Sequence, residues 1–235
     1  MLGSSFALSM QTAQDLTSPI SASWSSEIKP DKDDNQATQE MLALLEVWPY
    51  VDRPQPEHFR FTKENISRLI AKGADLNVKT KAGKTPLIKA VGDNNVEIVH
   101  LLINAGAHID EKKAPIVLAA IMNSTKMVDE LIKLGANVNQ QDETGKTPLY
   151  VAVWHSNPAM IKLLLNAGAD IDKTSAGITP LMQAVITKNP NIVGLLLQEG
   201  ADRAINDSDG MTALDMAKGI NNSEIIDLIN NRKIE

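Results

Sequence analysis

The chain has 235 residues, of which 43% are hydrophobic and 22% charged, and its formal net charge is −6. This is the composition of an ordinary soluble globular protein, and it argues against disorder along the whole chain. There is no cysteine, which excludes a disulfide framework, a thiolate metal site and a cysteine nucleophile. The negative charge is the wrong sign for a nucleic-acid or anionic membrane surface, and no run of about 18 apolar residues predicts a membrane span.

The first segment, residues 1–36, is rich in Ser, Thr, Asp and Gln, which predicts a disordered tail. No Lys or Arg precedes Lys29, so the basic start of a secretory signal is absent. Residues 6–9 (Phe-Ala-Leu-Ser) still resemble the end of a signal with a cleavage site, so the tail is alternatively the remnant of an export signal. We expect a cytoplasmic protein by default, and an exported or periplasmic one under that alternative.

Two helices are predicted next. Apolar residues share one helical face over residues 37–48, and Pro49 ends this helix. A proline-rich stretch over 49–61 predicts an irregular connection. The second helix is expected over 62–72 and is followed by Gly73, a typical C-terminal stop.

Internal repetition is the strongest signal in the remainder of the chain. Gly-Ala pairs recur in steps of 29 to 33 residues and begin at Gly73, Gly106, Gly135, Gly168 and Gly200. A second mark, Thr-Pro-Leu or a variant of it, recurs in register with them and begins at Thr85, Ala114, Thr147, Thr179 and Thr212. Each of the first four marks lies 21 residues before the next Gly-Ala pair. The unit between them therefore has a fixed length, and the variation lies in the connections.

The residue types at these marks predict a pair of helices in each unit. Thr caps a helix N-terminus, and Pro suits the first helical position because its missing N–H would have no partner there. Ten residues after each mark comes a second capping residue: Asn95, Ser124, Asn157, Asn189 and Asn222. The Gly of each Gly-Ala pair supplies a left-handed stop for the second helix. Each unit is therefore helix, turn, helix and an extended turn.

This pattern resembles the ankyrin repeat, a unit of about 33 residues with a TPLHxA motif. The resemblance covers residues 73–235 in five copies and implies an all-α fold, an ankyrin-type α-solenoid of stacked helix pairs with β-hairpin tips. We interpret residues 77–235 as the array, with its last repeat acting as a C-terminal cap, and residues 37–76 as a divergent N-terminal capping repeat. In such a stack each repeat is stabilised mainly by its neighbours.

The chain departs from the family pattern in two ways. The motif His is replaced in all five copies, by Ile88, Val117, Tyr150, Met182 and Asp215, so the usual His-mediated polar network is not expected. Ala114 follows Gly106 by eight residues, whereas the corresponding separation is eleven or twelve elsewhere. This short connection predicts a truncated tip and a notch in the row of tips near residues 110–113.

Catalytic and cofactor motifs are not found. Gly83-Lys84-Thr85 and its counterpart at Gly145 resemble the end of a P-loop, but the upstream glycine of that motif is missing, so we interpret both as tip turns. Four scattered histidines form no i,i+4 metal pair, and no Gly-x-Ser-x-Gly elbow occurs. Carboxylates such as Asp170 and Asp207 are interpreted as turn formers. We expect no metal, no cofactor and no catalytic residue.

The candidate site follows from the resemblance, which implies that first helices and tips line a concave surface that contacts partners. The residues expected there are Tyr150, Trp154, His155, Ile121, Met122, Met182 and Ile186, with Lys84, Lys113 and Lys146 at the tips. After residue 76 the only aromatic residues are Tyr150 and Trp154, which lie four apart on one predicted helix. Tyr and Trp are enriched among interface anchors. The alternative is that Tyr150 fills the motif position and Trp154 packs against neighbouring helices.

The function expected from this surface is non-catalytic binding of another protein, as an adaptor or as an inhibitor that acts by occlusion. The partner should present an apolar knob with an acidic rim. One alternative is a microbial effector or immunity protein that neutralises a toxin or enzyme, and another is an enzyme whose site is assembled across repeats. We expect a monomer that binds no nucleic acid and does not insert into a membrane.

Overall fold

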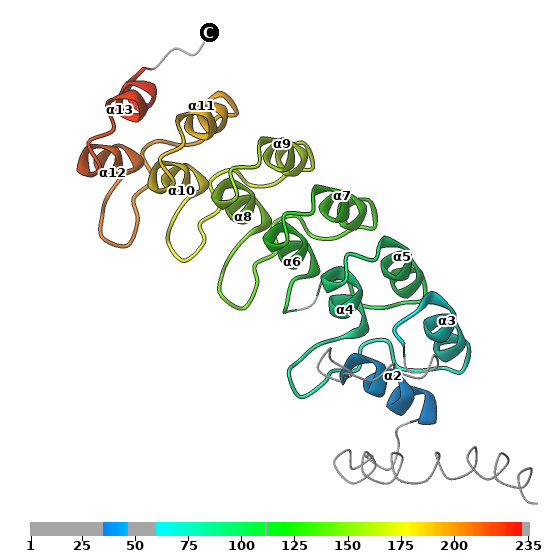
Figure 1. Ribbon diagram of the computed structural model, residues 1–235. Helices are drawn as coiled ribbons and strands as arrows, with labels where there is room; N and C mark the ends of the chain where they lie inside the picture. Colours follow the sequence, from blue (N-terminus) through cyan, green and yellow to red (C-terminus); the bar gives the residue numbers. More distant parts are fainter. Residues whose placement is uncertain (1–34, 47–59, 111, 232–235) are drawn as a thin grey trace, which may run out of the picture.

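The computed structural model describes residues 35–46, 60–110 and 112–231. Twelve helices fall within these ranges, and they stack as consecutive pairs along one axis (Figure 1). The same ranges contain no regular β-strand, and an isolated antiparallel bridge joins Ser175 to Ile178. The predicted all-α solenoid of helix pairs is therefore confirmed. All but the last two residues of the predicted tail, and most of the proline-rich connection, lie outside the described residues, and Gln36 already belongs to the first helix.

The first helices of the pairs form one row and the second helices form a parallel row. The first helices are α2 (Gln36–Glu46), α4 (Pro86–Gly92), α6 (Pro115–Ile121), α8 (Pro148–Trp154), α10 (Pro180–Ile186) and α12 (Ala213–Gly219). The second helices are α3 (Lys63–Ala71), α5 (Val96–Asn104), α7 (Thr125–Lys133), α9 (Pro158–Asn166), α11 (Pro190–Gln198) and α13 (Ser223–Asn230). Figure 1 shows loops projecting from the first-helix row, which we call the tips. We number the pairs from one to six, so that α6 and α7 form the third.

The first pair covers the N-terminal end of the stack. Helices α2 and α3 pack on each other, α2 packs on α4, and α3 packs on α5. The Asn35 side chain donates to the backbone oxygens of Lys72 and Gly73 at 3.1 and 2.9 Å, which joins the start of α2 to the end of α3. These contacts suit the capping role expected of this pair, while the domain limits at residues 36 and 76 stay predictions.

The helix ends have the capping that their residue types predict. Before α4, α8 and α10 a Thr hydroxyl accepts a hydrogen bond from the backbone N–H three residues later, and Pro occupies the first helical position. The five predicted second-helix caps, Asn95, Ser124, Asn157, Asn189 and Asn222, all accept in the same way. Gly106 and Gly168 end their helices at φ values of 99° and 88°, a region that favours glycine. The capping residues therefore determine where the helices of each pair begin and end.

The core is one continuous aliphatic cluster that runs through the stack. Equivalent leucines of the second helices, including Leu102, Leu131 and Leu164, are fully buried. Each first helix packs on the next first helix along the row, and among the second helices α3 packs on α5, α7 on α9 and α11 on α13. A buried leucine stabilises the fold by about 1.5–3 kcal/mol, so each pair owes much of its stability to the adjacent pairs.

A ladder of side-chain hydrogen bonds also joins successive pairs. The residue four positions after the Gly in each of the first four Gly-Ala pairs accepts from a backbone N–H of the next repeat. The side-chain oxygen of Asn77 accepts from the His108 N–H (2.8 Å), that of Asp110 from the Asn137 N–H (3.1 Å), that of Asn139 from the Asp170 N–H (2.8 Å), and that of Asp172 from the Asp202 N–H (2.9 Å). The turn-forming role predicted for the loop carboxylates is confirmed, since Asp170 also accepts from the Asp172 N–H within its own turn.

The third pair begins differently from the others. Ala114 precedes α6 at φ 41°, a left-handed conformation, and it offers no side-chain cap. In the neighbouring repeats, backbone hydrogen bonds close the tips between Thr80 and Lys84 and between Asp142 and Lys146, both at 3.0 Å. These bonds confirm the prediction that the two Gly-Lys-Thr segments are tip turns.

Candidate partner-binding surface

Exposed apolar side chains gather on one face of the stack, made by the first helices and the tips, which we call the first-helix face. Trp154 is 52% exposed, Ile186 49% and Ile121 39%. Each is the last residue of its first helix, and we call these three the apolar row. Met122, the residue after Ile121, is 40% exposed and widens the row. The equivalent positions in the second and sixth pairs are glycines, so the row is confined to the middle of the stack.

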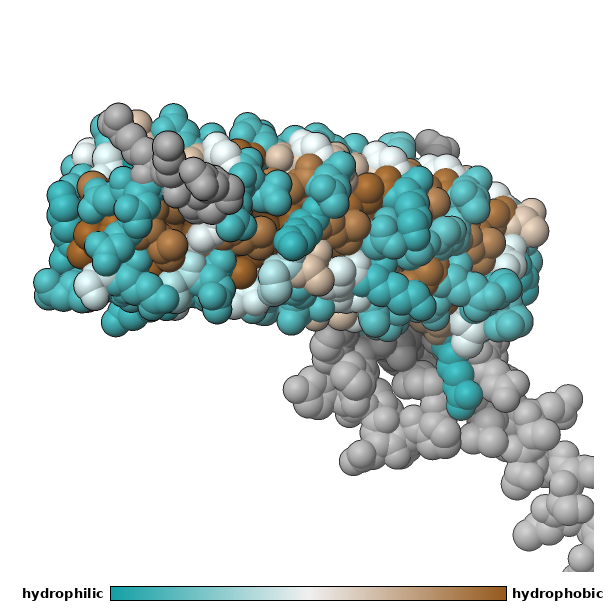
Figure 2. All heavy atoms as spheres, turned by 90° about the horizontal axis from the view of Figure 1, so that it is seen from above, coloured by the Kyte–Doolittle hydropathy of each residue, from teal (hydrophilic) through white to brown (hydrophobic). Residues whose placement is uncertain are grey.

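The second-helix side of the molecule has a different character. Seen from above, hydrophilic residues line both long edges of that side, with hydrophobic residues in a band between them (Figure 2). The large hydrophobic residues that are most exposed in the described chain are the apolar row, Met122 and Met211, and none of them lies on a second helix. Polar contacts instead join second helices: Lys63 forms an ion pair with Glu97, and the His100 Nε2 lies 2.8 Å from a Glu130 carboxylate oxygen.

Neighbouring polar groups hold Trp154 in place at the end of α8. The Lys146 Nζ lies 5.9 Å from the centre of the Trp154 indole, within the range of a cation–π contact. The His155 ring lies beside the indole, with centroids 5.2 Å apart. The His155 Nε2 is 2.9 Å from the carbonyl oxygen of Ile121, and because a carbonyl only accepts, this nitrogen carries the proton. These contacts tie the fourth pair to the third and favour one indole orientation.

Tyr150 and Met182 occupy the same register position but are less available than the sequence predicts. Met182 is fully buried, so its predicted contact with a partner is wrong. This position packs against the adjacent first helix, and it is buried at Ile88 and Val117 too. Tyr150 is half-buried because its larger ring extends beyond the covered zone, and burial raises the pKa of its hydroxyl. Tyr150 therefore offers a partner only part of its ring.

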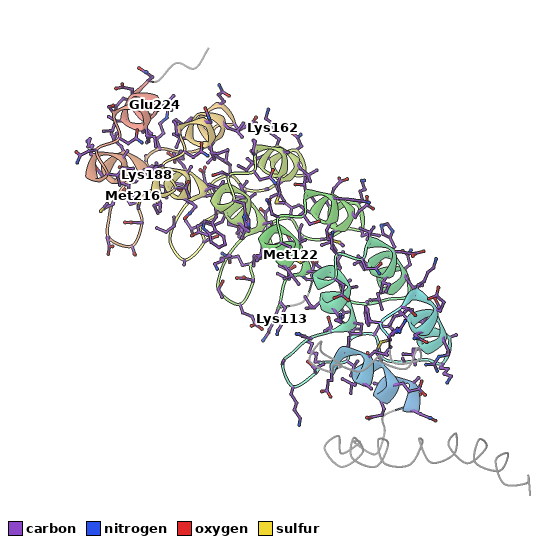
Figure 3. The ribbon with its side chains drawn as sticks, in the orientation of Figure 1. Lys113, Met122, Lys162, Lys188, Met216 and Glu224 are labelled. Atoms are coloured by element: carbon purple, nitrogen blue, oxygen red, sulfur yellow. The ribbon has the colours of Figure 1, made fainter. Side chains whose placement is uncertain are left out.

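Three lysines form a second row on this face, at the position immediately before each helix cap. We call Lys84, Lys113 and Lys146 the lysine row. The Lys113 Nζ donates to the backbone oxygen of Ala82 in the preceding tip, which holds the lysine across the short connection. In Figure 3, Lys113 and Met122 lie on the side of the tips, whereas Lys162 lies on the side of the second helices. The structure thus brings the predicted lysines onto the same face as the apolar row.

A hollow of about 400 Å³ lies at the predicted notch. The apolar side chains Ile88, Leu118 and Ile121 line it, and Lys84 and Lys113 contribute to one side. The neighbouring tip contributes residues 142–144, which stand where a full third tip would adjoin them. Ile88 and Leu118 were not predicted as site residues. The eight-residue connection was the signal for the notch, but which helix residues would line it was not visible in the sequence.

The described residues show no group of three or more metal-ligating side chains. Within the same part of the chain, no helix is long and apolar enough to cross a membrane. The surface features that remain are the apolar row, the lysine row and the hollow.

The sequence model of one family, described as "Ankyrin repeats (3 copies)", matches residues 60–142, 106–175 and 169–235. The chain belongs to the ankyrin repeat family. Ankyrin repeats are a protein-interaction module, and the family is generally non-catalytic.

Similar proteins carry the repeats in longer chains. An interferon antagonist of vaccinia virus (strain Western Reserve) is 36% identical over 85 residues, which are 35% of this chain and 30% of that protein. An interferon antagonist of monkeypox virus is 34% identical over 105 residues, 44% of this chain and 35% of that protein. The ankyrin repeat and SAM domain-containing protein 6 of Rattus norvegicus is 33% identical over 92 residues, 39% of this chain and 10% of that protein. The matched segments therefore span about a third or less of each relative.

Proposed function

We propose that this ankyrin repeat protein binds one partner protein through its first-helix face, as an adaptor or as an inhibitor that covers the partner's functional surface. The observation that supports this most is the apolar row. Three large side chains at one register position are between 39 and 52% exposed, although the same position is glycine in two other repeats. Exposed apolar groups that recur in this way mark interaction surfaces.

The anchor of the proposed interface is Trp154. Its indole is held by Lys146 and by His155, so little side-chain freedom is lost when a partner covers it. Tryptophan at the centre of an interface typically contributes 2 kcal/mol or more to binding. Ile121 and Ile186 flank it on the two adjacent first helices and would exclude water around it.

Inhibition by occlusion has support from the relatives. Two viral proteins that share these repeats are named interferon antagonists. Antagonism by a non-catalytic repeat module needs only a surface that covers the partner, which the first-helix face offers. Neutralisation of a toxin or an enzyme by an effector or immunity protein would use the same face, so the partner's identity decides between these roles.

Affinity capture from the native source with the full chain as bait tests the proposal. Trp154→Ala should weaken retention of the partner roughly 30-fold, equivalent to about 2 kcal/mol, with an unchanged circular dichroism spectrum. Met211→Ala is the matched control, because Met211 is 39% exposed but lies in the last tip, outside the apolar row. Equal retention by wild type and by folded Trp154→Ala would disprove the proposed face.

A further inference from the structure

The apolar row is symmetric about Trp154. The five successive first helices from α4 to α12 end in Gly92, Ile121, Trp154, Ile186 and Gly219. This order is the same in both directions along the stack. Helices α6 and α10 each pack directly on α8, so the two isoleucines lie one helix spacing, about 8–10 Å, on either side of Trp154. In Figure 1, α8 lies midway between α4 and α12 in the first-helix row.

A row with this symmetry is complementary to itself. Two copies can face each other with their stacks antiparallel, related by a two-fold axis that runs parallel to α8 between the two first-helix faces. Trp154 then meets Trp154 of the second copy at the axis. Ile121 meets Ile186 of the second copy, and the same contact recurs on the other side of the axis. Every large side chain of the row therefore meets another large side chain, and the row ends at glycines in both copies.

The tips at the two ends of the face carry opposite charges. Residues 74–84, the tip before α4, contain three lysines and one aspartate, which gives a formal charge of +2. Residues 201–211, the tip before α12, contain three aspartates and one arginine, which gives a formal charge of −2. The antiparallel arrangement places the basic tip of each copy opposite the acidic tip of the other. Two favourable electrostatic contacts therefore flank the apolar centre.

The tip before α8 lies at the proposed axis and would face the same tip of the second copy. A surface that faces itself across a two-fold axis avoids repulsion when it contains both signs of charge. This tip does so, because Glu143 is exposed and Lys146 follows it by three positions. The Lys146 Nζ lies 5.9 Å from the centre of the Trp154 indole, so positive charge is held beside the axis. Glu143 of the second copy would lie at the same tip-to-tip contact.

We propose that a second copy of this chain covers the first-helix face, in an antiparallel two-fold dimer with Trp154 at the axis. The dimer goes beyond the proposed function, because it follows from the symmetry of the row and the charges of the tips and needs no foreign partner. It would bury the same face that a partner protein would contact. Self-association and partner binding therefore exclude each other.

The dimer should be weak. Its apolar centre has three large exposed side chains from each copy, whereas a stable interface takes about 20–30 residues from each side. We expect a dissociation constant of roughly 10–100 µM. The monomer expected from the sequence is then the form present at low micromolar concentration, where the face is open to a partner.

Sedimentation equilibrium of the full chain, at concentrations from roughly 1 to 500 µM, tests this proposal because the range brackets the expected dissociation constant. The wild-type chain should pass from monomer to dimer across this range. Trp154→Ala should weaken the dimer roughly 30-fold or more, because each interface loses both of its central indoles. Lys162→Glu is the control, because Lys162 is exposed on the side of the second helices (Figure 3) and should leave the dimer unchanged.

Exchanging charge between the two end tips tests the antiparallel arrangement. Lys79→Glu/Lys81→Glu makes the tip before α4 acidic, and Ser208→Lys/Asp209→Lys makes the tip before α12 basic. Each double variant alone places like charges opposite each other at both end contacts, and we expect its dimer to be about tenfold weaker. An equimolar mixture of the two should form a heterodimer of nearly wild-type affinity, because both end contacts again join opposite charges.

The outcomes separate this dimer from the proposed function. A wild-type chain that stays monomeric at the highest concentration would overturn the dimer and leave partner binding through this face standing. A dimer that Trp154→Ala does not weaken, or a mixture of the charge variants that associates no better than either one alone, would also overturn it. Weakening of the dimer by Trp154→Ala, with partner retention unchanged, would support the dimer and disprove the proposed function.

Discussion

The third and fourth pairs have helices of equal length but differ in what comes before them. Helices α6 and α8 have seven residues each, and α7 and α9 have nine. The fourth pair follows a closed tip and a capping Thr147, whereas the third follows a short connection and Ala114 in a left-handed conformation. The comparison shows that the shared core determines the helices, while the connection determines the shape of the surface.

The short connection before the third pair also changes the surface that a partner would meet. The hollow lies beside this short connection, between Lys84 at the end of the second tip and residues 142–144 of the fourth. The shortened connection therefore changes the surface offered to a partner without changing the helix pair that carries it.

Equivalent core residues in the two pairs should contribute equally to stability. Leu131 and Leu164 occupy the same register position and are both fully buried. We expect Leu131→Ala and Leu164→Ala each to lower the free energy of unfolding by about 2–5 kcal/mol, measured by urea denaturation. A much smaller loss for Leu131→Ala would show that the third pair is more loosely packed and would break the comparison.

Replacing the short third connection should reduce partner binding more than stability. Substituting residues 136–146, the fourth connection, for residues 107–113 would give the third pair a full-length tip. We expect partner affinity to fall about tenfold, a loss of about 1.4 kcal/mol, because the added residues fill the hollow. Calorimetry of binding measures this effect, and thermal unfolding is the control. Unchanged affinity would mean that the hollow is not part of the interface.

Loss of the buried Thr147 cap of the fourth pair should lower the stability of the fold. The Thr147 hydroxyl accepts from the Tyr150 N–H at 3.1 Å, and the Thr147 N–H donates to the Ser175 hydroxyl at 3.0 Å. Thr147→Ala should lower the free energy of unfolding by about 1–2 kcal/mol. Chemical denaturation monitors this, and Thr212→Ala in the last pair provides a second cap for comparison.

The reverse substitution in the third pair should not stabilise it. Ala114→Thr restores the residue type found before the other pairs, but the left-handed φ of 41° disfavours a β-branched side chain. Ala114 is also fully buried, so extra atoms need space. We expect a loss of about 1 kcal/mol in urea unfolding. A gain in stability would indicate that the connection can adopt the conformation of its neighbours.

A small pH effect should distinguish the second helices of the two pairs. Hydrogen bonds from Lys133 and His100 lower the pKa of Glu130, whereas the equivalent residue of α9 is Leu163. A lowered folded-state pKa means that the contribution is present above the ordinary value of 4.5 and is lost as pH falls through the lowered pKa. Glu130→Gln should therefore reduce the loss of stability between about pH 5 and pH 3. An identical pH profile for the variant would contradict the assignment.

The sequence predicts the helix pairs well because their determinants are local and repeated. A capping Thr or Asn, a Pro at the first helical position and a Gly after the last turn act within a few residues of themselves. Burial across the stack is not local, and for this reason Met182 was predicted on the surface but is covered by a neighbouring helix. The hydrogen bond from His155 to Ile121 joins residues 34 apart and follows only once the pairs are placed. The notch was predicted from one short connection, but the lining of the hollow comes from the second and third pairs and from the tip before the fourth.

Hydroxyl-radical footprinting of the complex with its captured partner would identify the side chains that the partner covers, because oxidation reports the solvent exposure of individual side chains. We expect Trp154 and Met122 to become protected when the partner binds, while Met211, which is about as exposed as Met122, is oxidised as in the free protein. Unchanged oxidation of both Trp154 and Met122 in a stoichiometric complex would contradict binding through the first-helix face.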